Sequence, residues 1–308
     1  MKIRNIAVIG TCAALASSLL CACSFEVPVN AADMADYSVG DAVIEEKVES
    51  LDIDWSSGIV TVETHRGDTV EIIETTSQEL PDSKRVHWLL DGTTLRIIYS
   101  APVGVSIMTG EKELTVRLPE SVPLSFLKTD VSSAYVSITG ITADTAEIGA
   151  SSGRITGDFS AKKLNASASS GDMDITLLGD CESADLGASS GKISLHADSV
   201  GSIKAGTSSG AIEIYAESVE NLDASTSSGG VRAFLETAPA KADIHASSGN
   251  VELYMPENAD FTLDVDTGSG DVSWDVPLKR DGDRYVSGNG SGSIKIDTSS
   301  GNVRIGKI

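Results

Sequence analysis

The sequence has 308 residues, a formal net charge of −22, 41% hydrophobic residues and only 5% aromatic residues, with 29 glycines. It is too apolar for a disordered acidic chain and too rich in glycine and serine for a helical globule, so it favours turn-dense β structure. The 23 basic residues against 45 acidic ones exclude nucleic acid as a partner, because binding to phosphate backbones depends on Lys and Arg.

The N-terminal residues predict a lipoprotein signal. Two basic residues precede an apolar run over residues 6–22, which is too short for a spanning helix and ends in Leu-Cys-Ala-Cys at Cys23. This ending resembles a bacterial lipobox, in which the cysteine is acylated. We expect residues 1–22 to be the signal peptide, Cys23 to carry lipid, and residues 23–44 to form a tether. An ordinary secretory signal or a membrane anchor is the alternative.

This signal predicts an extracytoplasmic location, with a lipid anchor as the link to the membrane. Anionic headgroups repel an acidic body, so surface electrostatics would not hold it there. Three of the four cysteines lie in or beside the signal, which leaves Cys181 alone in the body. No disulfide framework is therefore expected, and we interpret Cys181 as an incidental thiol in a variable turn.

Residues 45–123 are expected to form an N-terminal β cap. Apolar residues alternate with polar ones on both sides of Gly58, as in Leu51, Ile53 and Trp55. Residues 69–73, 94–98 and 113–118 read as further strands.

Residues 124–308 contain a repeated tripeptide, Ser-Ser-Gly. From Ala134, which ends a Ser-Ser-Ala variant, to Gly270, which ends Gly-Ser-Gly, the steps are 19, 18, 20, 19, 19, 20 and 21 residues. A period that drifts by a residue or two indicates structural coils with a variable turn opposite a constant one. The constant turns are predicted at Gly58, Gly153, Gly171, Gly191, Gly210, Gly229, Gly249, Gly270 and Gly301.

Within each coil, strict alternation marks an inward face. Around Gly210 the inward positions before the turn are Ile203, Ala205, Thr207 and Ser209, and those after it are Ile212, Ile214 and Ala216. Period two over this length is typical of strands with one buried face. The inward residues shrink towards the turn, which accounts for a core with few aromatic residues.

The turn residues suggest a mechanism for the corner. Glycine tolerates a left-handed backbone, which suits a sharp reversal, and serine hydroxyls can bond freed backbone groups. The alternation places the second serine of each turn inward, where hydroxyls could bond along a stack. The serines in question are Ser152, Ser170, Ser190, Ser209, Ser228 and Ser248.

Two strands per coil, stacked position on position, predict a single-stranded β-solenoid resembling a right-handed β-helix, with coils of about 19 residues. The eight turns from Ala134 to Gly270 would give a rod of roughly 38 Å. A three-sided left-handed hexapeptide helix is the nearest alternative. An insertion containing Asp281 and Asp283 separates Gly270 from Gly301, and the strand pair around Gly301 is expected to close the stack.

These features together resemble the bacterial toast-rack domain family, whose members are named as candidate adhesins of unknown function. The resemblance covers residues 45–308. It is carried by the lipobox, the pair around Trp55-Ser56-Ser57-Gly58, the strand ending Val116-Arg117-Leu118-Pro119 and the serial Ser-Ser-Gly coils, the last of which is Asp297-Thr298-Ser299-Ser300-Gly301-Asn302-Val303-Arg304-Ile305. It implies a β-helix at the cell envelope, connected to adhesion or envelope-stress sensing, and no catalytic residues.

Catalytic patterns in the repeats are explained by the repetition itself. The segments that begin at Gly149, Gly187 and Gly206 fit G-x-S-x-G, but a nucleophile elbow needs one strand-to-helix turn and a histidine partner. His65, His87, His196 and His245 show no metal spacing. We expect no catalytic residue, no metal site and no cofactor.

One acidic cluster is a candidate calcium site. Asp264, Asp266, Asp271 and Asp275 are expected to project from one coil, and calcium binds several oxygen ligands gathered in a loop. Spaced carboxylates on strands more often form a solvated face. A different acidic set, Asp172, Asp174, Glu213 and Glu252, is a possible docking surface for a basic partner.

Polysaccharide-processing β-helices need clustered acids and aromatic platforms. The outward positions here show hardly any aromatic residues beyond Tyr215 and Tyr254, on different coils. The sequence therefore predicts a non-enzymatic, lipid-anchored envelope module for adhesion or protein interaction, with glycan binding as the alternative. The partner, an envelope protein or glycan, is not identified.

Overall fold

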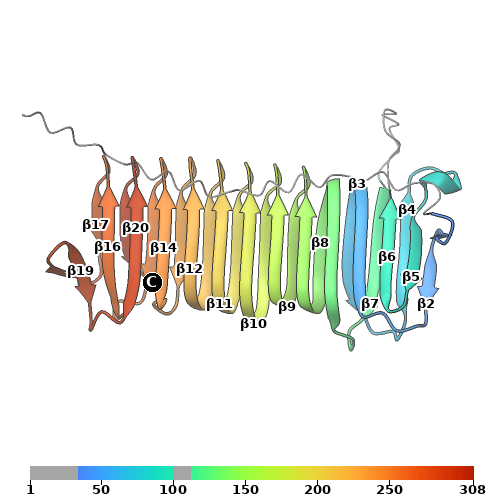
Figure 1. The fold of residues 1–308 in the computed structure, drawn as a ribbon, viewed down its shortest axis with the longest axis horizontal. Helices are drawn as coiled ribbons and strands as arrows, with labels where there is room; N and C mark the ends of the chain where they lie inside the picture. The colour runs from blue at the N-terminus through green and yellow to red at the C-terminus, as the bar shows by residue number, and fades with distance from the viewer. Residues whose placement is uncertain (1–33, 100–111) are drawn as a thin grey trace, which may run out of the picture. The chain divides into compact units, whose positions relative to one another are not determined.

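Parallel strands stacked one coil above another make up most of the protein (Figure 1). The structure is a computed structural model that describes residues 34–99 and 112–308. Residues 37–308 form one unit, which contains all the strands of these described ranges. None of the described residues forms a helix that is long and apolar enough to span a membrane.

The central coils confirm the predicted β-solenoid. Over residues 155–226 each strand runs from one Ser-Ser-Gly corner to the next, whereas the strand before them continues through the Ser132-Ser133-Ala134 corner. The strands pair in parallel with their neighbours, so that Ile175 lies beside Leu195 and Leu195 beside Ile214. The strands are β8 (Leu124–Ala150), β9 (Ile155–Ala168), β10 (Met173–Ala188), β11 (Ile193–Thr207) and β12 (Ile212–Thr226).

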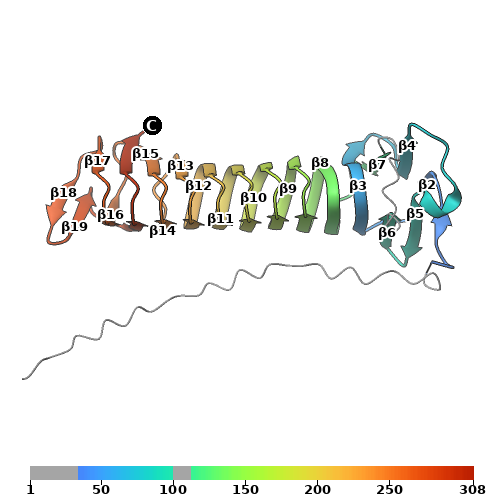
Figure 2. The same cartoon turned by 90° about the horizontal axis from the view of Figure 1, so that it is seen from above.

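Each coil has two arms on opposite sides of the stack, as Figure 2 shows. The first arm follows a corner and the second precedes the next one. Between them lies the variable turn, where the pairing of β10 with β11 shifts between Leu177 and Asp180. The varying coil length is therefore absorbed opposite the corner, as the drifting period predicted.

In the later coils the arms are separate strands. First arms are β13 (Val231–Leu235), β15 (Val251–Met255), β17 (Val272–Trp274) and β21 (Val303–Lys307). Second arms are β14 (Lys241–Ala246), β16 (Phe261–Thr267) and β20 (Gly292–Thr298).

The interior is the predicted alternating set. Ile203, Ala205, Ile212 and Ile214 are at most 1% exposed, while the residues between them face solvent. Because each inward side chain stacks on its equivalent in the next coil, residues 37–308 share one continuous apolar core.

The corner serines are not inward, and that expectation was wrong. Ser152, Ser170, Ser190, Ser209, Ser228 and Ser248 are all exposed. The chain steps outward over both serines of each tripeptide and returns with the glycine, so the alternation is interrupted at the corner. The small inward residue is the one before the first serine, such as Thr207, which is 6% exposed.

The explanation offered for the corner glycines was also wrong, apart from Gly58. Of the nine corner glycines only Gly58, with φ +108°, has a left-handed backbone. The others are needed because the coils approach closely. A Cβ on Gly210 would lie 1.8 Å from the carbonyl oxygen of Gly191, and one on Gly229 would lie 1.7 Å from that of Gly210. At these corners only a residue without a side chain fits against the neighbouring carbonyl.

The C-terminal coil does not close the stack, contrary to expectation. Strand β20 lies between β14 and β16, and β21 lies between β15 and β17. The last coil in the sequence, formed by β20 and β21, therefore lies between the coil of β14 and β15 and the coil of β16 and β17. The outer coil is bordered by the insertion, which folds as a hairpin of β18 (Lys279–Asp281) and β19 (Arg284–Ser287) and pairs antiparallel with β16.

The other end has the same out-of-order arrangement. Strand β3 (Ser50–His65) pairs with β8 on one side and with β6 (Thr94–Tyr99) and β7 (Lys112–Pro119) on the other. Antiparallel pairing adds β4 (Val70–Thr76) to β7, β5 (His87–Asp91) to β6, β2 (Ala42–Ile44) to β4 and β1 (Ser38–Val39) to β5. The short 3-10 helix Asp82–Lys84 precedes β5.

Candidate functional site

Four aromatic side chains stack on the face made by the first arms. His196, Tyr215, Phe234 and Tyr254 each lie five residues after a corner glycine, so the parallel register places them side by side. Their ring centroids are 4.5, 4.8 and 4.6 Å apart in that order, with interplanar angles of 6°, 3° and 5°. We call these four residues the aromatic ladder.

The aromatic ladder presents ring edges to solvent, because neighbouring rings cover each other's faces. Tyr215, Phe234 and Tyr254 are half-buried and His196 is exposed. Beyond Tyr254 the next coil has Gly306, and a Cβ there would lie 2.4 Å from the Tyr254 ring. The small residue leaves room for the last ring of the stack.

A row of alternating charge runs beside the aromatic ladder, three residues after each corner glycine. Glu213, Arg232, Glu252 and Arg304 occupy successive coils of this row. Arg232 binds Glu252 with two hydrogen bonds of 3.1 Å, and the Tyr254 hydroxyl donates to Glu252 Oε2 at 2.9 Å. These hydrogen bonds, that from Arg232 first, lower the pKa of Glu252.

This row changes the view of the acidic docking surface. Glu213 pairs with Lys192 at 2.7 Å, and Glu252 with Arg232. Asp172 accepts a hydrogen bond from the backbone N–H of Lys192 at 2.9 Å. The carboxylates are therefore interleaved with cations and do not form an anionic patch. We call this surface the ladder face. It consists of the outward-facing residues within 192–197, 211–216, 230–235, 250–255, 302–307 and 271–275, and it includes the aromatic ladder and the row of alternating charge.

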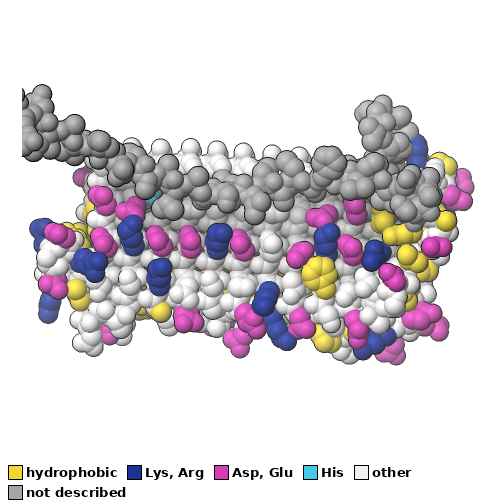
Figure 3. All heavy atoms as spheres, viewed as in Figure 1, with side chains coloured by type: hydrophobic (Ala, Val, Ile, Leu, Met, Phe, Trp, Pro, Cys, Tyr) yellow, Lys and Arg dark blue, Asp and Glu magenta, His cyan; other side chains and the backbone are white. Residues whose placement is uncertain are grey.

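The opposite face, made by the second arms, has its own row of alternating charges (Figure 3). In stack order the row is Arg96, Asp52, Lys128, Glu147, Asn165, Asp185, Lys204, Asp223, Asp243, Lys295 and Asp264. Only Asp223 and Asp243 put like charges side by side. Burial, together with the neighbouring Asp243, raises the pKa of Asp223.

The carboxylates considered for calcium lie apart in the terminal region. Asp264 and Asp266 belong to β16 on the second-arm face, whereas Asp271 and Asp275 flank β17 on the ladder face. Asp264 pairs with Arg284 at 3.6 Å and Asp275 with Arg304 at 3.2 Å. Over residues 34–99 and 112–308, no three His, Cys, Asp or Glu side chains gather to hold a metal ion.

The other sequence candidates fall at separate places. The three G-x-S-x-G segments lie at corners that join strand to strand, without the helix that a nucleophile elbow requires. His245 is exposed on the second-arm face, on the opposite side from His196. Cys23 lies outside the described residues.

Cys181 is a buried thiol, 5% exposed, and not a surface one. Its Sγ contacts the carbonyl oxygen of Ser183 at 3.3 Å and that of Lys162 at 3.5 Å. Burial raises the pKa of the thiol, which keeps it protonated and poorly nucleophilic.

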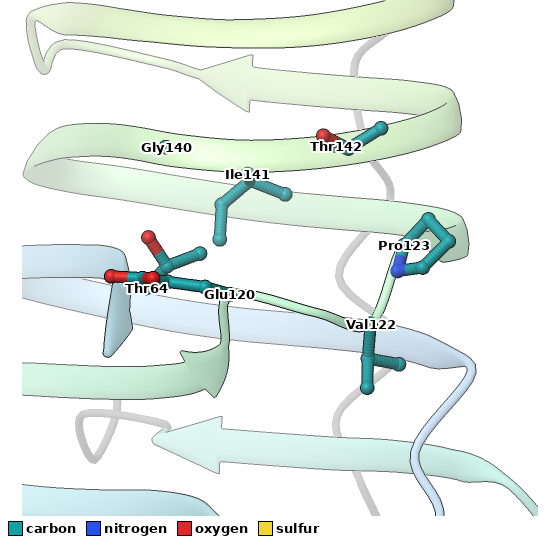
Figure 4. A pocket seen from close by; sticks show the side chains of 7 residues that line it. All are labelled: Thr64, Glu120, Val122, Pro123, Gly140, Ile141 and Thr142. Carbon is teal, nitrogen blue, oxygen red and sulfur yellow. The ribbon is translucent and has the colours of Figure 1, made fainter. Parts of the chain in front are cut away.

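A small pocket of about 220 Å³ lies at the variable-turn edge near the N-terminal coils (Figure 4). It is lined by Thr64, Glu120, Val122, Pro123, Gly140, Ile141 and Thr142. Glu120 supplies the one ionisable side chain of the lining, so the pocket offers no pair of acid and base groups for catalysis.

A buried ion pair fixes the first coils. The side chains of Lys112 and Glu74 are 2% and 4% exposed and lie 2.7 Å apart. The ammonium also donates to the carbonyl oxygen of Lys84 at 2.5 Å and lies 3.3 Å from the Tyr99 ring centroid. Burial lowers the pKa of Lys112, and the hydrogen bond that its ammonium donates to Glu74 opposes this shift.

Sequence reasoning missed the aromatic ladder, although the signal was present. From the sequence, Tyr215 and Tyr254 were noted only as outward aromatic residues on different coils. Counting five residues after each corner glycine gives His196, Tyr215, Phe234 and Tyr254 in four consecutive coils. The same count would have predicted the stack.

Solved structures with a similar fold come from three bacteria. A candidate cell-adhesion protein of Clostridium sporogenes is 12% identical and covers 88% of this chain and 100% of its own, with a TM-score of 0.25. A candidate adhesin of Bacteroides fragilis is 14% identical, covers 88% and 97%, and has a TM-score of 0.40. A candidate lipid-binding protein of Parabacteroides distasonis is 13% identical, covers 89% and 97%, and has a TM-score of 0.36.

At such identities and scores, the names of those proteins do not extend to this chain. No curated protein matches the sequence. The Toastrack DUF4097 family model, in contrast, matches residues 48–306, which include the N-terminal coils, every Ser-Ser-Gly corner and the inserted C-terminal coil. The chain belongs to the Toastrack DUF4097 family.

Proposed function

We propose that this protein is a non-enzymatic, lipid-anchored module of the cell envelope that binds another protein through the ladder face, in adhesion or in envelope-stress sensing. The observation that carries the proposal is the aromatic ladder beside a row of alternating charges. Half-exposed aromatic residues and arginine are enriched where proteins bind one another. Rigid strands hold these side chains in place, so little conformational entropy is lost on binding.

A non-enzymatic role is supported by the distribution of reactive groups. Cys181 is buried, and burial raises the pKa of its thiol. The corners with a G-x-S-x-G pattern join strand to strand without the helix of a nucleophile elbow. Three carboxylates of the ladder face, Glu213, Glu252 and Asp275, pair with Lys192, Arg232 and Arg304. Within the described residues, no pair of titratable groups with opposed pKa shifts faces a shared cavity, which is the usual arrangement of an acid and a base.

The stacking geometry disfavours the glycan-binding alternative. Sugars pack their C–H groups against the faces of aromatic rings, where the π electrons are concentrated. In the aromatic ladder neighbouring rings cover both faces of Tyr215 and Phe234 and one face each of His196 and Tyr254, so mainly edges are presented. A protein surface can use the edges and the adjoining charges together.

Crosslinking of the lipidated protein in its own membrane tests the proposal. The double variant Tyr215→Ala/Phe234→Ala should lose protein crosslinks that the wild type forms. The control is Asp185→Asn/Lys204→Gln, which alters the opposite face and should keep them. Equal crosslinking by all three proteins would reject the ladder face, and capture of glycan without protein would favour the alternative.

A processed, lipidated Cys23 is the second part of the proposal. Mass spectrometry of the mature N-terminus should find acyl chains on Cys23. An unmodified start downstream of Cys23, or a retained signal segment, would reject the anchor and leave the binding role to be judged by the crosslinks.

A further inference from the structure

The ladder face is self-complementary in charge. In stack order its central row reads Glu213, Arg232, Glu252, Arg304, so that the signs are negative, positive, negative, positive. A twofold axis in the plane of the face, parallel to the strands and midway between Arg232 and Glu252, reverses this order. Each residue of one copy then faces a residue of opposite charge in the other copy.

We propose that the partner of the ladder face is a second copy of this chain, bound antiparallel about that axis. The inference rests on the proposed interaction role and names its partner. In this arrangement Arg232 faces Glu252 of the second copy and Glu213 faces Arg304 of the second copy. Every charge of the row gains a second counter-ion.

The flanking rows obey the same symmetry. Lys192, nearer the corner, faces Asp271 of the second copy, and His196, at the end of the aromatic ladder, faces Asp275. Phe234 faces Tyr254 of the second copy, so ring edges meet ring edges at the centre of the interface. An apolar centre with charges around it is the usual anatomy of a protein interface.

The alternation also fixes the register of the two copies. A shift of one copy by one coil brings Glu252 opposite Glu252 of the second copy and Arg232 opposite Arg304. A shift in the other direction brings Arg232 opposite itself and Glu213 opposite Glu252. Like charges across an interface are strongly unfavourable, so both one-coil shifts are disfavoured. A shift of two coils restores opposite charges but keeps only two of the four ion pairs of the row, so the unshifted antiparallel register is favoured.

The side chains are free to take part. Lys192 and Arg232 are each 44% exposed, and Arg304 is 53% exposed. Their ion pairs within the chain leave unused capacity, because a guanidinium has five N–H donors and a carboxylate accepts at about four sites. The intramolecular pairs therefore hold the side chains in place for the second copy.

The size of the face predicts a weak dimer. Six coils at about 4.8 Å and arms of about five residues give a patch of roughly 30 by 17 Å. Two such patches bury on the order of 1,000 Å², the lower end for specific interfaces. We expect a dissociation constant in the micromolar range, and association that is weakened by salt.

Charge exchange tests the arrangement. Glu213→Arg places arginine opposite Arg304 of the second copy, and Arg304→Glu places glutamate opposite Glu213. Sedimentation of the full chain in non-ionic detergent should show each variant alone with at least a tenfold weaker dimer than the wild type. An equimolar mixture of the two variants should regain it, because the mixed dimer restores both pairs. Asp185→Arg, on the opposite face, should dimerise like the wild type.

Thermal unfolding, followed by circular dichroism, confirms that each variant is folded before it is compared. The proposal is overturned if the wild type stays monomeric up to on the order of 0.1 mM, if the single variants dimerise as well as the wild type, or if the mixture does not recover. Loss of protein crosslinks in the Tyr215→Ala/Phe234→Ala variant, without any dimer in sedimentation, would retain the proposed function and reject the second copy as its partner.

Discussion

The corner glycines are governed by distance and not by backbone conformation. Stacked coils lie about 4.8 Å apart, and at the corner the glycine Cα turns towards the carbonyl of the coil beside it. A methyl group on Gly210 would overlap that oxygen. The glycine of the tripeptide is thus a packing requirement wherever the corner lies against the carbonyl of the coil beside it.

A matched pair of substitutions isolates this effect. Gly210→Ala should lower the free energy of unfolding by about 3 kcal/mol or more, because the backbone of two coils must separate. Gly187→Ala adds the same methyl where nothing lies within 4 Å, and should leave stability unchanged or raise it by up to about 1 kcal/mol. Denaturant unfolding of both variants measures the difference; equal effects would contradict the close-approach explanation.

The threonine before the two corner serines forms hydrogen bonds with the glycine of its own corner and with the corner glycine of the adjacent coil. Thr207 Oγ1 accepts from the N–H of Gly210 at 3.1 Å and donates to the carbonyl oxygen of Gly191 at 3.4 Å. Thr226, Thr267 and Thr298 repeat both contacts. This threonine takes the place that we had expected of the second serine.

The nearly isosteric change Thr207→Val removes the hydroxyl and keeps the volume. It should cost about 1–2 kcal/mol of unfolding free energy, because the buried N–H of Gly210 loses its acceptor. Ser209→Ala, at an exposed serine, should cost less than about 0.5 kcal/mol. Melting temperatures that fall equally would restore the inward assignment of Ser209.

At the scale of elements, the alternation and the repeat predicted the two arms of each coil. They could not predict the path of the chain at the corners, nor the spatial order of the coils. Alternation holds in Ile203, Ala205 and Thr207, and resumes at Ile212, because one buried face imposes it. It says nothing about Ser208 and Ser209, where the chain leaves the sheet. To predict the aromatic ladder, equivalent positions in successive coils, such as Tyr215 and Phe234, have to be aligned. That alignment requires the register between coils to be known.

The first coils are held by a different element, the buried Lys112–Glu74 pair between β7 and β4. Replacement of Glu74 by Gln leaves the Lys112 ammonium without its counter-ion in a site that is almost closed to solvent. We expect a loss of about 3 kcal/mol at neutral pH. Glu63→Gln, which removes an exposed partner of Arg117, should cost less than about 1 kcal/mol.

The pH dependence of the Glu74→Gln stability deficit distinguishes the loss of the ion pair from a general packing defect. Lys112 has a folded pKa below its unfolded value, so its penalty is fully present below the folded pKa and disappears as pH rises towards the unfolded value of about 10.4. Glu74→Gln lowers the folded pKa further. The stability deficit of this variant should therefore shrink between neutral pH and pH ~10; a constant deficit would indicate lost packing alone.

For the whole of residues 37–308, the out-of-order coils at both ends were beyond sequence reasoning. The strands around Gly249, Gly270 and Gly301 have the same alternation, so any of the three could follow another in space. Their order is set by two connections. One is the short link between β15 and β16, and the other is the hairpin of β18 and β19, after which the chain enters the space between β14 and β16. As a result, the C-terminal coil has a paired neighbour on each side. The free edge belongs to β17 and to the part of β16 after Leu263, because β19 pairs with residues 261–263.

This arrangement predicts where the stack opens. Amides of β20, such as that of Ile296, should exchange with solvent as slowly as that of Ile244 in β14, because breaking either one disrupts pairing on two sides. Amides near the free edge, such as those of Thr267 and Trp274, should exchange faster through local fraying, since the outer coil is paired along its full length on one side only. Native-state hydrogen exchange resolved by residue measures both. If Ile296 exchanged as fast as Trp274 while Ile244 stayed protected, the C-terminal coil would be the outermost one and the inserted order would be wrong.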